Sequence, residues 1–562
     1  MMRAWAVMAV ALLAGAARAA ADDAAESAYA RVSGAKVSAE EARARVHALA
    51  LAMNEAQLSR SAAAVLGELA RDAAQPEAIR DAARAELAGR AASDPVALAA
   101  LLDEGASGKP APALALQLAR GHLERALQLA PPSEGAAFEA IQQGPSLSQA
   151  SVETQPLDKD LAAELGQTAP DPVAPAPPEA RPELSQAQRD SARELDAARA
   201  LAALASDEPE SHEVAGLAAL AAADNEGATK EFLVLAQAEP SRSDLAGQAR
   251  RDRAYLQLAR LAYQGGDDAR ATALYERVGR GAPEWLEALF EASWAHFREG
   301  QDEKALGNLL TLHAPFFSGR FFPESFVLKA LVLYENCRYA DARKTLAEFD
   351  QRYRELHEGL GETVARLPTP QSAFELLARG ATGVQELPQS ARAEVARLAQ
   401  EPDLRDTAQA AAQLSQELDS IDKRTPAFRN GLLVRAAGPA ARAARLQLMD
   451  ASGKKLVSRL QAERRELREL LSQSLRLSYE IAGREKEQAV SPAQAQLTQA
   501  HREPQQIEDG EELWPFEGEY WRDELGSYRF QLGQRCQRAR RAPLNVQEQH
   551  AAPARVAGDP AQ

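Results

Sequence analysis

The chain has 562 residues, enough for several domains, and carries 81 acidic against 65 basic side chains, a net charge of -16. This negative charge disfavours nucleic acid as a partner. Aromatic residues make up only 5% of the chain, and alanine, leucine, glutamate and arginine dominate, which is typical of long helices. We therefore expect an all-α protein.

The first residues predict an export signal, residues 1–19. Arg3 supplies the positive charge, an apolar stretch follows from Ala4 to Ala16, and Ala17-Arg18-Ala19 is a cleavage site of the A-x-A type, with Ala19-Ala20-Ala21 as the alternative. The apolar stretch is too short for a membrane anchor, and no cysteine follows it to carry a lipid. We expect a soluble periplasmic protein that meets membranes only through its partners.

Residues 24–130 predict an N-terminal module of helical hairpins. Apolar residues recur there every three or four positions, and Gly and Pro are rare within these runs. Asp94-Pro95 predicts a helix start, with Asp94 as the cap. The stretch 131–188 has six prolines between Pro170 and Pro182 and predicts an extended linker, with a docking motif as the alternative.

Residues 191–362 contain a repeated pattern of small and large apolar residues. Its equivalent positions, in groups of three, are Ala262, Gly266 and Ala271, then His296, Gly300 and Ala305, then Leu333, Cys337 and Ala342. The small residues let two antiparallel helices approach closely, and larger side chains fill the groove to the next pair. Gly266 and Gly300 fit tight turns between helices.

A period of about 34 residues with this pattern resembles the tetratricopeptide repeat (TPR) family, although Tyr255 and Leu289 replace its leading Trp. The resemblance implies an α-hairpin solenoid with a concave peptide-binding surface. Another α-hairpin solenoid is the alternative and would change little about function.

The TPR resemblance also implies which side chains line the concave surface. Carried onto this sequence, the groove residues are Leu256, Arg260, Tyr263, Phe290, Trp294, Phe297, Val327, Leu331 and Tyr334. Five of them are aromatic, which favours a groove that accepts a segment of a partner. The alternatives are that these side chains form core between repeats, or that another part of the chain covers them.

Residues 363–490 predict a helical region with a coiled-coil hairpin. One heptad contains Leu404, Ala411, Leu414, Leu418 and Ile421; a second places Leu446, Leu460, Leu467 and Ile481 at one seam position and Met449, Leu456, Leu470 and Leu477 at the other, with Gly453, Glu463 and Ser474 as exceptions. The break with Pro426, Gly431, Gly438 and Pro439 predicts the loop of an antiparallel hairpin. Residues 429–486 hold 13 basic against 6 acidic side chains. This excess predicts either a solvated helix face or a surface for an acidic partner or anionic lipid.

The aromatic C-terminal segment, residues 505–536, contains Trp514, Phe516, Tyr520 and Trp521. Aromatic residues at this density predict burial on a surface. The tail 537–562 is polar and rich in Pro and Ala, which predicts disorder.

Cys337 and Cys536 are the only cysteines and predict either a disulfide or two separate buried thiols. Cys337 takes the turn position that Gly266 and Gly300 hold in the neighbouring repeats. If the aromatic segment packs back on the repeats, the two sulfurs could meet. We expect this docking beside the third repeat turn whether or not the bond forms.

The sequence contains no H-E-x-x-H, no G-x-S-x-G, no phosphate-binding glycine loop and no C-x-x-C. His296 and His313 are interpreted as structural residues. We expect no enzyme activity, no cofactor and no metal site.

Three runs carry a narrower resemblance. Residues 292–297, 335–339 and 514–521 are similar to TPR proteins of the myxobacterial cell envelope, which include periplasmic components of the adventurous gliding motility (Glt) machinery. That resemblance implies a link between an inner-membrane motor and outer-membrane components. We expect a non-catalytic periplasmic scaffold that joins envelope proteins. The alternative is a TPR accessory factor of outer-membrane or peptidoglycan biogenesis.

Overall fold

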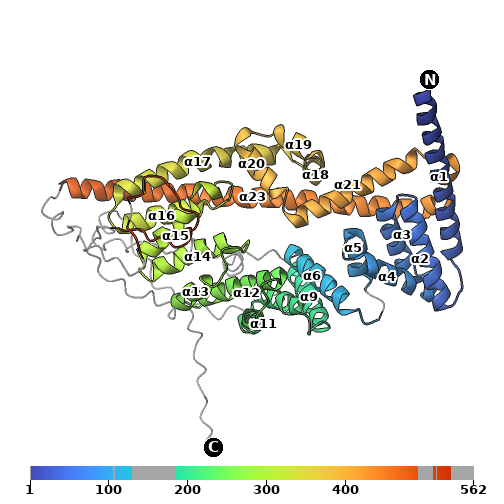
Figure 1. Ribbon diagram of the computed structural model, residues 1–562, viewed down its shortest axis with the longest axis horizontal. Coiled ribbons are helices and arrows are strands. Elements are labelled where there is room, and N and C mark those ends of the chain that lie inside the picture. Colours follow the sequence, from blue (N-terminus) through green and yellow to red (C-terminus); the bar gives the residue numbers. More distant parts are fainter. Residues whose placement is uncertain (1, 106–107, 130–184, 491–510, 514, 533–562) are drawn as a thin grey trace, which may run out of the picture. The chain divides into compact units, whose positions relative to one another are not determined.

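Helices make up every regular element in the part of the chain that the computed structural model describes, and no strand occurs there. The described residues are 2–105, 108–129, 185–490, 511–513 and 515–532, without the side chains of 2–16, 437 and 487–490 (Figure 1). The all-α prediction is confirmed. Within these residues, the chain divides into unit 1, which contains the described residues up to 129 with 185–235 and 355–467, and unit 2, which contains 236–354, 468–490 and the described residues from 511 to 532.

Unit 1 contains most of the helices. They are α1 (Met2–Val32), α2 (Ala39–Glu55), α3 (Ser59–Arg71), α4 (Glu77–Arg90), α5 (Pro95–Glu104), α6 (Pro112–Leu129), α9 (Gln186–Ala203), α10 (Pro209–Ala221), α18 (Pro370–Arg379), α19 (Ala381–Gln385), α20 (Gln389–Leu398), α21 (Pro402–Asp422) and α22 (Pro426–Arg429). Helices α11 (Asn225–Gln237), α17 (Tyr339–Arg366) and α23 (Leu432–Val490) each contribute residues to both units.

The main core of unit 1 joins residues that are far apart in the sequence. Leu49 and Leu66 of the first helices share one buried cluster with Leu414 of α21, Phe428 of α22 and Leu433 of α23. The N-terminal helices therefore pack with the predicted hairpin. A smaller cluster packs α9 and α10 against α6, so the residues from 191 to 235, which the sequence pattern placed in the repeats, belong to unit 1.

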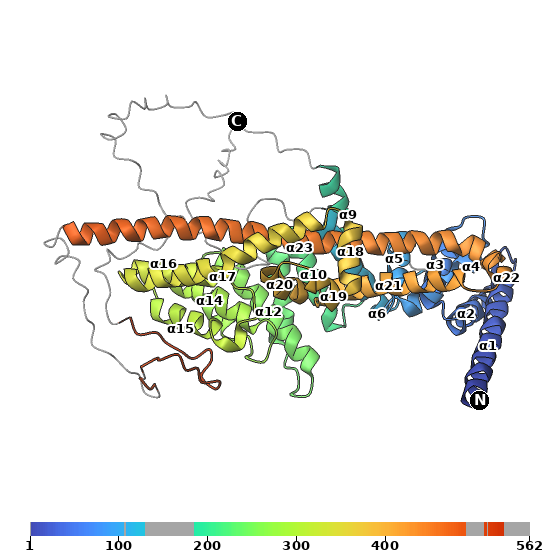
Figure 2. The same cartoon turned by 90° about the horizontal axis from the view of Figure 1, so that it is seen from above.

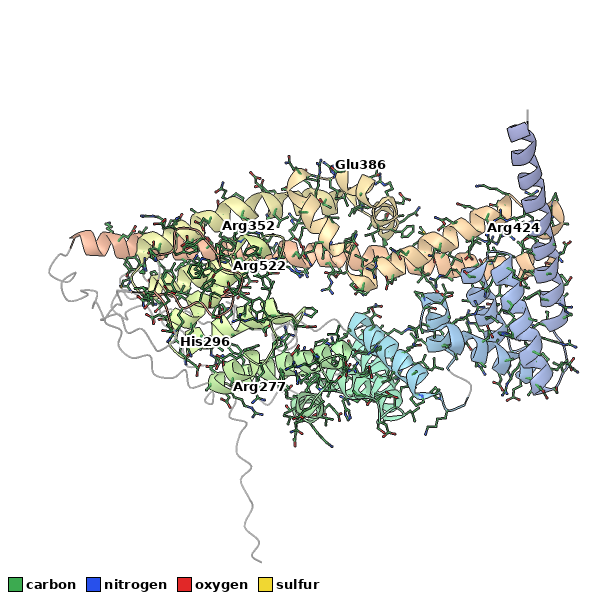
Figure 3. The ribbon with its side chains drawn as sticks, in the orientation of Figure 1. Arg277, His296, Arg352, Glu386, Arg424 and Arg522 are labelled. Carbon is green, nitrogen blue, oxygen red and sulfur yellow. The ribbon has the colours of Figure 1, made fainter. Side chains whose placement is uncertain are left out.

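Charged contacts reinforce this core. The Glu417 carboxylate of α21 accepts hydrogen bonds from the backbone amides of Arg60 (2.9 Å) and Ser61 (2.7 Å) at the start of α3, where a negative charge is favourable. Arg424, labelled in Figure 3, forms a buried ion pair with Asp22 and donates to the Ala56 carbonyl at 2.6 Å. The predicted cap Asp94 is confirmed, because its carboxylate accepts from the Val96 amide at 3.0 Å.

Helix α21 lies beside the first part of α23 in both views (Figures 1 and 2). An ion pair joins Lys455 of α23 to Asp403 at the start of α21. Close by, Arg397 of α20 pairs with both Glu394 and Glu463, at 2.5 Å from the latter. The pKa of Glu463 is raised to about 9, chiefly by burial and also by the neighbouring Glu394, while Arg397 opposes both effects.

Two details of the predicted hairpin are wrong. The loop ends at Gly431, and α23 continues through Gly438 and Pro439, because Leu433 and Ala441 on either side are buried in the unit 1 core. Leu446 is 58% exposed, and Leu448 is buried in its place. From Gly453 to Ile481 every predicted seam position of α23 is buried, so the seven-residue repeat follows the buried face there and departs from it only at its start, at Leu446.

Unit 2 begins with three helix pairs. The elements that lie wholly in unit 2 are α12 (Leu245–Gln264), α13 (Asp268–Tyr275), α14 (Trp285–Arg298), α15 (Asp302–Leu312), the 3-10 helix η1 (Pro315–Phe317) and α16 (Glu324–Glu335). The turns α12–α13, α14–α15 and α16–α17 contain Gly266, Gly300 and Cys337, with φ of 78°, 75° and 58°. Each turn is closed by the same type of backbone hydrogen bond. For example, the Gln301 amide donates to the His296 carbonyl at 2.8 Å, and the Arg338 amide donates to the Leu333 carbonyl at 2.9 Å. These are left-handed helix ends of the Schellman type, at the positions that the sequence predicted for turns.

Candidate protein-interaction surface

The predicted groove residues are almost all buried in the structure. Eight of them are at most 9% exposed: Leu256, Arg260, Tyr263, Phe290, Trp294, Phe297, Val327 and Leu331. Tyr334 is half-buried. Trp294 is the largest of the fully buried side chains, at 1% exposure. These residues form part of the core of unit 2 and do not line an open groove, which corrects the interpretation that the sequence favoured.

The chain itself covers the row of aromatic side chains. Leu477 and Ile481 of α23 belong to the same buried cluster as Phe290 and Trp294. Phe322, which precedes α16, packs on Phe290 with 5.8 Å between ring centroids. Cover by another part of the chain was one of the alternatives from the sequence, but α23 was not expected there, because the whole of this helix was expected to pair with α21. Helix α21 has 21 residues against 59 in α23, so the last turns of α23 pack elsewhere.

Arg260, predicted as a polar contact for a partner, makes an internal ion pair. Its Nε donates to Glu291 Oε2 at 3.0 Å, and its Nη2 donates to Glu291 Oε1 at 2.6 Å and Glu287 Oε1 at 2.5 Å. Glu291 is 0% exposed. Burial raises the pKa of Glu291 to about 7, although the nearby Arg260 guanidinium lowers it. The pair therefore fixes α12 against α14 and leaves Arg260 unable to reach a partner.

The C-terminal part of unit 2 lies on the repeats. Residues 511–532, which we call the docked segment, contact α15 through backbone atoms: Phe530 N donates to Glu303 O at 3.0 Å, and Gly526 N donates to Thr311 Oγ1 at 2.9 Å. Arg280 donates to the Asp523 carbonyl at 2.8 Å. The predicted docking of the aromatic segment on the repeats is confirmed for these residues.

Apolar side chains anchor the docked segment. Leu525 and Tyr528 are each 7% exposed and pack with Ala314 in one buried cluster, against which Trp285 and Phe317 also pack. Near the third repeat turn, the Arg338 guanidinium lies 5.4 Å from the centre of the Phe530 ring. The anchor of the segment is thus its second half, which contains Tyr528 and Phe530, the last two residues of the aromatic cluster in the sequence.

The first half of the docked segment remains exposed and forms an aromatic surface with η1. Its large apolar side chains are Phe316 (50% exposed), Leu513 (45%), Phe516 (46%) and Trp521 (43%). The Phe516 and Tyr520 rings lie 5.2 Å apart. The Arg522 guanidinium, labelled in Figure 3, lies 5.3 Å from the centre of the Phe316 ring. Trp514 lies outside the described residues. Exposed aromatic groups of this density are typical of interaction sites.

Carboxylates alternate with these aromatic residues along the docked segment. Glu512, Glu517, Asp523 and Glu524 are exposed, and Glu519 accepts a hydrogen bond from the Glu517 amide at 2.9 Å. The two arginines of the docked segment make local contacts, Arg522 with Phe316 and Arg529 with Glu511 at 2.7 Å. We call the exposed Glu512, Glu517, Asp523 and Glu524 the acidic rim. The aromatic residues of the segment were predicted from the sequence, but Phe316 and this rim were not.

Cys337 combines a left-handed backbone conformation with a disulfide-bonded sulfur. Its φ of 58° lies in the left-handed region that favours glycine. Its sulfur takes part in a disulfide and lies 3.4 Å from Tyr339 Oη. Cys536 lies outside the described residues, so the pairing of these two cysteines stays a prediction.

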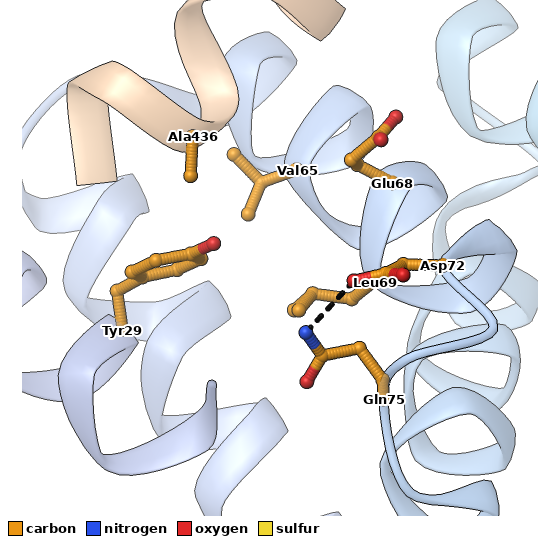
Figure 4. Close-up of a pocket in the computed structure, with 7 residues that line it drawn as sticks. All are labelled: Tyr29, Val65, Glu68, Leu69, Asp72, Gln75 and Ala436. Atoms are coloured by element: carbon orange, nitrogen blue, oxygen red, sulfur yellow. Dashed lines mark hydrogen bonds between the residues drawn. The ribbon is translucent and has the colours of Figure 1, made fainter. Parts of the chain in front are cut away.

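A small pocket lies in unit 1, between α1, α3 and α23 (Figure 4). Its space of about 30 Å³ is lined by Tyr29, Val65, Glu68, Leu69, Asp72, Gln75 and Ala436. At the edge of the pocket, Asp72 accepts a hydrogen bond from Gln75 Nε2 at 3.0 Å. Such a volume holds one or two waters, so the pocket has no room for an organic ligand.

Among the described residues, no group of three or more His, Cys, Asp or Glu side chains is arranged to hold a metal ion. No helix in the described part combines the length and apolar character needed to cross a membrane. His296 Nδ1 donates a hydrogen bond to Gln301 Oε1 at 3.1 Å, and His313 Nε2 is hydrogen-bonded to Ser325 Oγ at 2.9 Å. No family model, no curated protein and no solved structure matches this chain.

Proposed function

We propose that this protein is a non-catalytic scaffold of the bacterial periplasm that binds other envelope proteins through the aromatic surface of its docked segment. The observation that carries the proposal is the exposure of Phe516 and Trp521, on a segment whose second half is firmly anchored, together with that of Phe316 in η1. Each of the three is at least 43% exposed. A rigid body that presents large aromatic side chains is suited to binding, because Trp and other aromatic residues carry much of the energy of protein interfaces.

The repeat region is proposed to be a TPR-type solenoid. The pattern of small residues and the equivalent turns at Gly266, Gly300 and Cys337 support this assignment. The solenoid's concave side would then be occupied by α23, and its partner surface would lie on the docked segment. Helices α21 and α23 are proposed to form an irregular coiled coil, since ion pairs such as Lys455 with Asp403 join them. The A-x-A site after the apolar stretch supports export.

The narrower proposal places the scaffold in a gliding-motility complex of the Glt kind, between a motor of the inner membrane and outer-membrane components. The sequence runs 292–297, 335–339 and 514–521 support it. The second candidate is an accessory role in outer-membrane or peptidoglycan biogenesis, which the same helical repeats would serve.

Affinity capture from envelope extracts tests the function. The full chain serves as bait beside the variants Trp521→Ala and Phe516→Ala, and Tyr479→Ala of α23 is the matched control, because Tyr479 is also an exposed aromatic residue, at 72%. Motility proteins captured by the wild type and the control, and lost from both variants, would support the narrower proposal. Assembly or wall enzymes would favour the second candidate. Equal capture by all four baits would rule out the aromatic surface as the binding site.

A further inference from the structure

The charge around the aromatic surface restricts what can bind there. Glu512, Glu517, Asp523 and Glu524 are exposed. The nearby cations are engaged in contacts of their own: Arg522 with the Phe316 ring, Arg529 with Glu511, and Arg280 with the Asp523 carbonyl and Ser527. A partner that covers the aromatic side chains brings its own charges close to this rim. Like charges placed opposite each other at an interface are strongly unfavourable, and opposite charges accelerate association.

Three kinds of occupant fit poorly. An anionic lipid surface and a nucleic acid would both bring negative charge to the acidic rim. A second copy of the chain, bound by the same face around a twofold axis, would place two acidic rims against each other. A cationic protein segment is favoured instead, because guanidinium and ammonium groups can pair with the carboxylates and also stack on aromatic faces. Arg522 on Phe316, 5.3 Å from the ring centre, is an internal example of this stacking.

We propose that the aromatic surface and its acidic rim bind an arginine- or lysine-rich segment of a partner protein that also carries apolar side chains. This inference rests on the proposed scaffold function and adds the chemistry of the partner. Trp521 and Phe516 contact the apolar side chains and the faces of the guanidinium groups. The acidic rim selects for cationic residues on either side.

Fluorescence anisotropy of the full chain with defined peptides tests the inference. The probe is a labelled peptide of alternating arginine and leucine, and the comparison peptide alternates glutamate and leucine. One variant neutralises the rim (Glu512→Gln, Glu517→Gln, Asp523→Asn, Glu524→Gln). Its matched control neutralises four exposed acidic residues of unit 1 (Glu40→Gln, Glu77→Gln, Asp207→Asn, Glu226→Gln). Both changes leave the core and the helices' apolar faces untouched.

The wild type and the control should bind the cationic peptide, and neither should bind the acidic peptide. Trp521→Ala should weaken binding by about thirtyfold, as is usual for a central aromatic contact. The rim variant should lose at least about tenfold. Raising the ionic strength from about 0.01 M to about 1 M shortens the Debye length from about 30 Å to about 3 Å, so wild-type affinity should fall while that of the rim variant changes little.

Three results would overturn the inference. Equal affinity of the rim variant and the wild type would show that the peptide binds elsewhere. A dimer in sedimentation analysis that Trp521→Ala dissociates would identify a second copy as the occupant. The chain's own tail contains Arg538, Arg540 and Arg541. If the peptide bound only after these three were changed to Gln in the full chain, the tail would be the occupant.

The two proposals fail in different ways. If capture depends on Trp521 but the peptides are not distinguished by charge, the scaffold function stands and the cationic partner is wrong. If the peptides are distinguished but capture from envelope extracts is the same for every bait, the surface is selective for cations and the scaffold function is wrong.

Discussion

The carbonyl oxygen of Tyr528 lies directly against Gly307 of α15, so that a Cβ atom at position 307 would come within 1.7 Å of it. The backbone of Arg529 is also close, at 3.1 Å from the same point. No side chain larger than a hydrogen atom fits at position 307 while the docked segment is in place. Gly307 is therefore the residue of α15 that admits the segment.

Gly307→Ala should displace the docked segment without unfolding α15, because alanine favours a helix but collides with Tyr528 O. We expect a loss of about 1–3 kcal/mol in the free energy of unfolding, as for other overpacked sites, and faster hydrogen exchange in residues 525–532. Gly483→Ala in α23 is the control, since no neighbouring group lies within 4 Å of the point that an alanine Cβ would occupy there; it should be neutral or slightly stabilising. Unchanged exchange in Gly307→Ala would contradict the observed docking.

Trp294→Ala together with Phe297→Ala should destabilise unit 2. The two side chains are 1% and 3% exposed and their ring centroids lie 6.2 Å apart. Truncation of a buried aromatic side chain typically costs about 3–5 kcal/mol. Urea unfolding followed by circular dichroism should show the loss. A double variant that kept wild-type stability but lost partner capture would restore the open-groove interpretation.

The stability of unit 1 should fall as the pH rises from about 5 to 9. Burial raises the pKa of Glu463 from 4.5 to about 9, so over this window the unfolded chain releases a proton that the folded chain keeps. The contribution of Glu463 is complete below pH 4.5 and is lost as the pH passes through 9. A single titrating group can change the free energy of unfolding by up to about 1.4 kcal/mol per pH unit.

Glu463→Gln is the matched test of this pH dependence. Glutamine reproduces the shape of the protonated acid, so stability near pH 5 should change little, and the decline towards pH 9 should become shallower. Thermal unfolding between pH 5 and 9 measures both. Asp450→Asn, at an exposed position of α23 in unit 1, is the control and should keep the wild-type slope. A wild-type profile that rises towards pH 9 would show that Glu463 is ionised in the folded protein.

Cys337 should be linked to Cys536. Mass spectrometry without reductant should find the cross-linked peptide, which closes a loop of about 200 residues and stabilises by about 4–5 kcal/mol on the chain-entropy model. Under reducing conditions Cys337→Gly should be more stable than Cys337→Ser by about 1–2 kcal/mol, because only glycine adopts a φ of 58° without strain. Alkylation of both cysteines in the untreated protein would refute the link.

The mature protein should begin at Ala20 or Asp22 and carry no lipid. This follows from the A-x-A site and from the lack of a cysteine after the apolar stretch. Either cleavage retains Asp22, which the ion pair with Arg424 requires. Sequencing of the N-terminus of the protein isolated from the cell envelope checks the site. Retention of residues 1–19 would exclude export by a cleaved signal.

Local features of the fold were predictable from the sequence. The cap at Asp94 and the turns at Gly266, Gly300 and Cys337 depend on neighbouring residues alone, and each lies where the pattern placed it. The helical class followed from composition and apolar spacing. These features involve contacts within a few residues, which propensity and periodicity describe well.

The partners of each helix face could not be predicted in the same way. Leu477 and Ile481 have the same heptad spacing as Leu456 and Leu460, yet the former pack with the repeats and the latter lie in the part of α23 that belongs to unit 1. Periodicity shows which face of a helix is apolar, and it does not identify what covers that face. The same limit explains why the aromatic row from Phe290 was interpreted as a groove.

The core of unit 1 also sets the order in which the protein can fold. About 300 residues separate Leu101 from Ala410, and both belong to one buried cluster. A ribosome needs about 15–60 s to add that many residues. During that time Leu49 and Leu66 lack the helices that finally cover them. The nascent N-terminal helices are thus exposed to aggregation and to proteases. A chaperone that holds the unfinished chain should raise the yield of native protein.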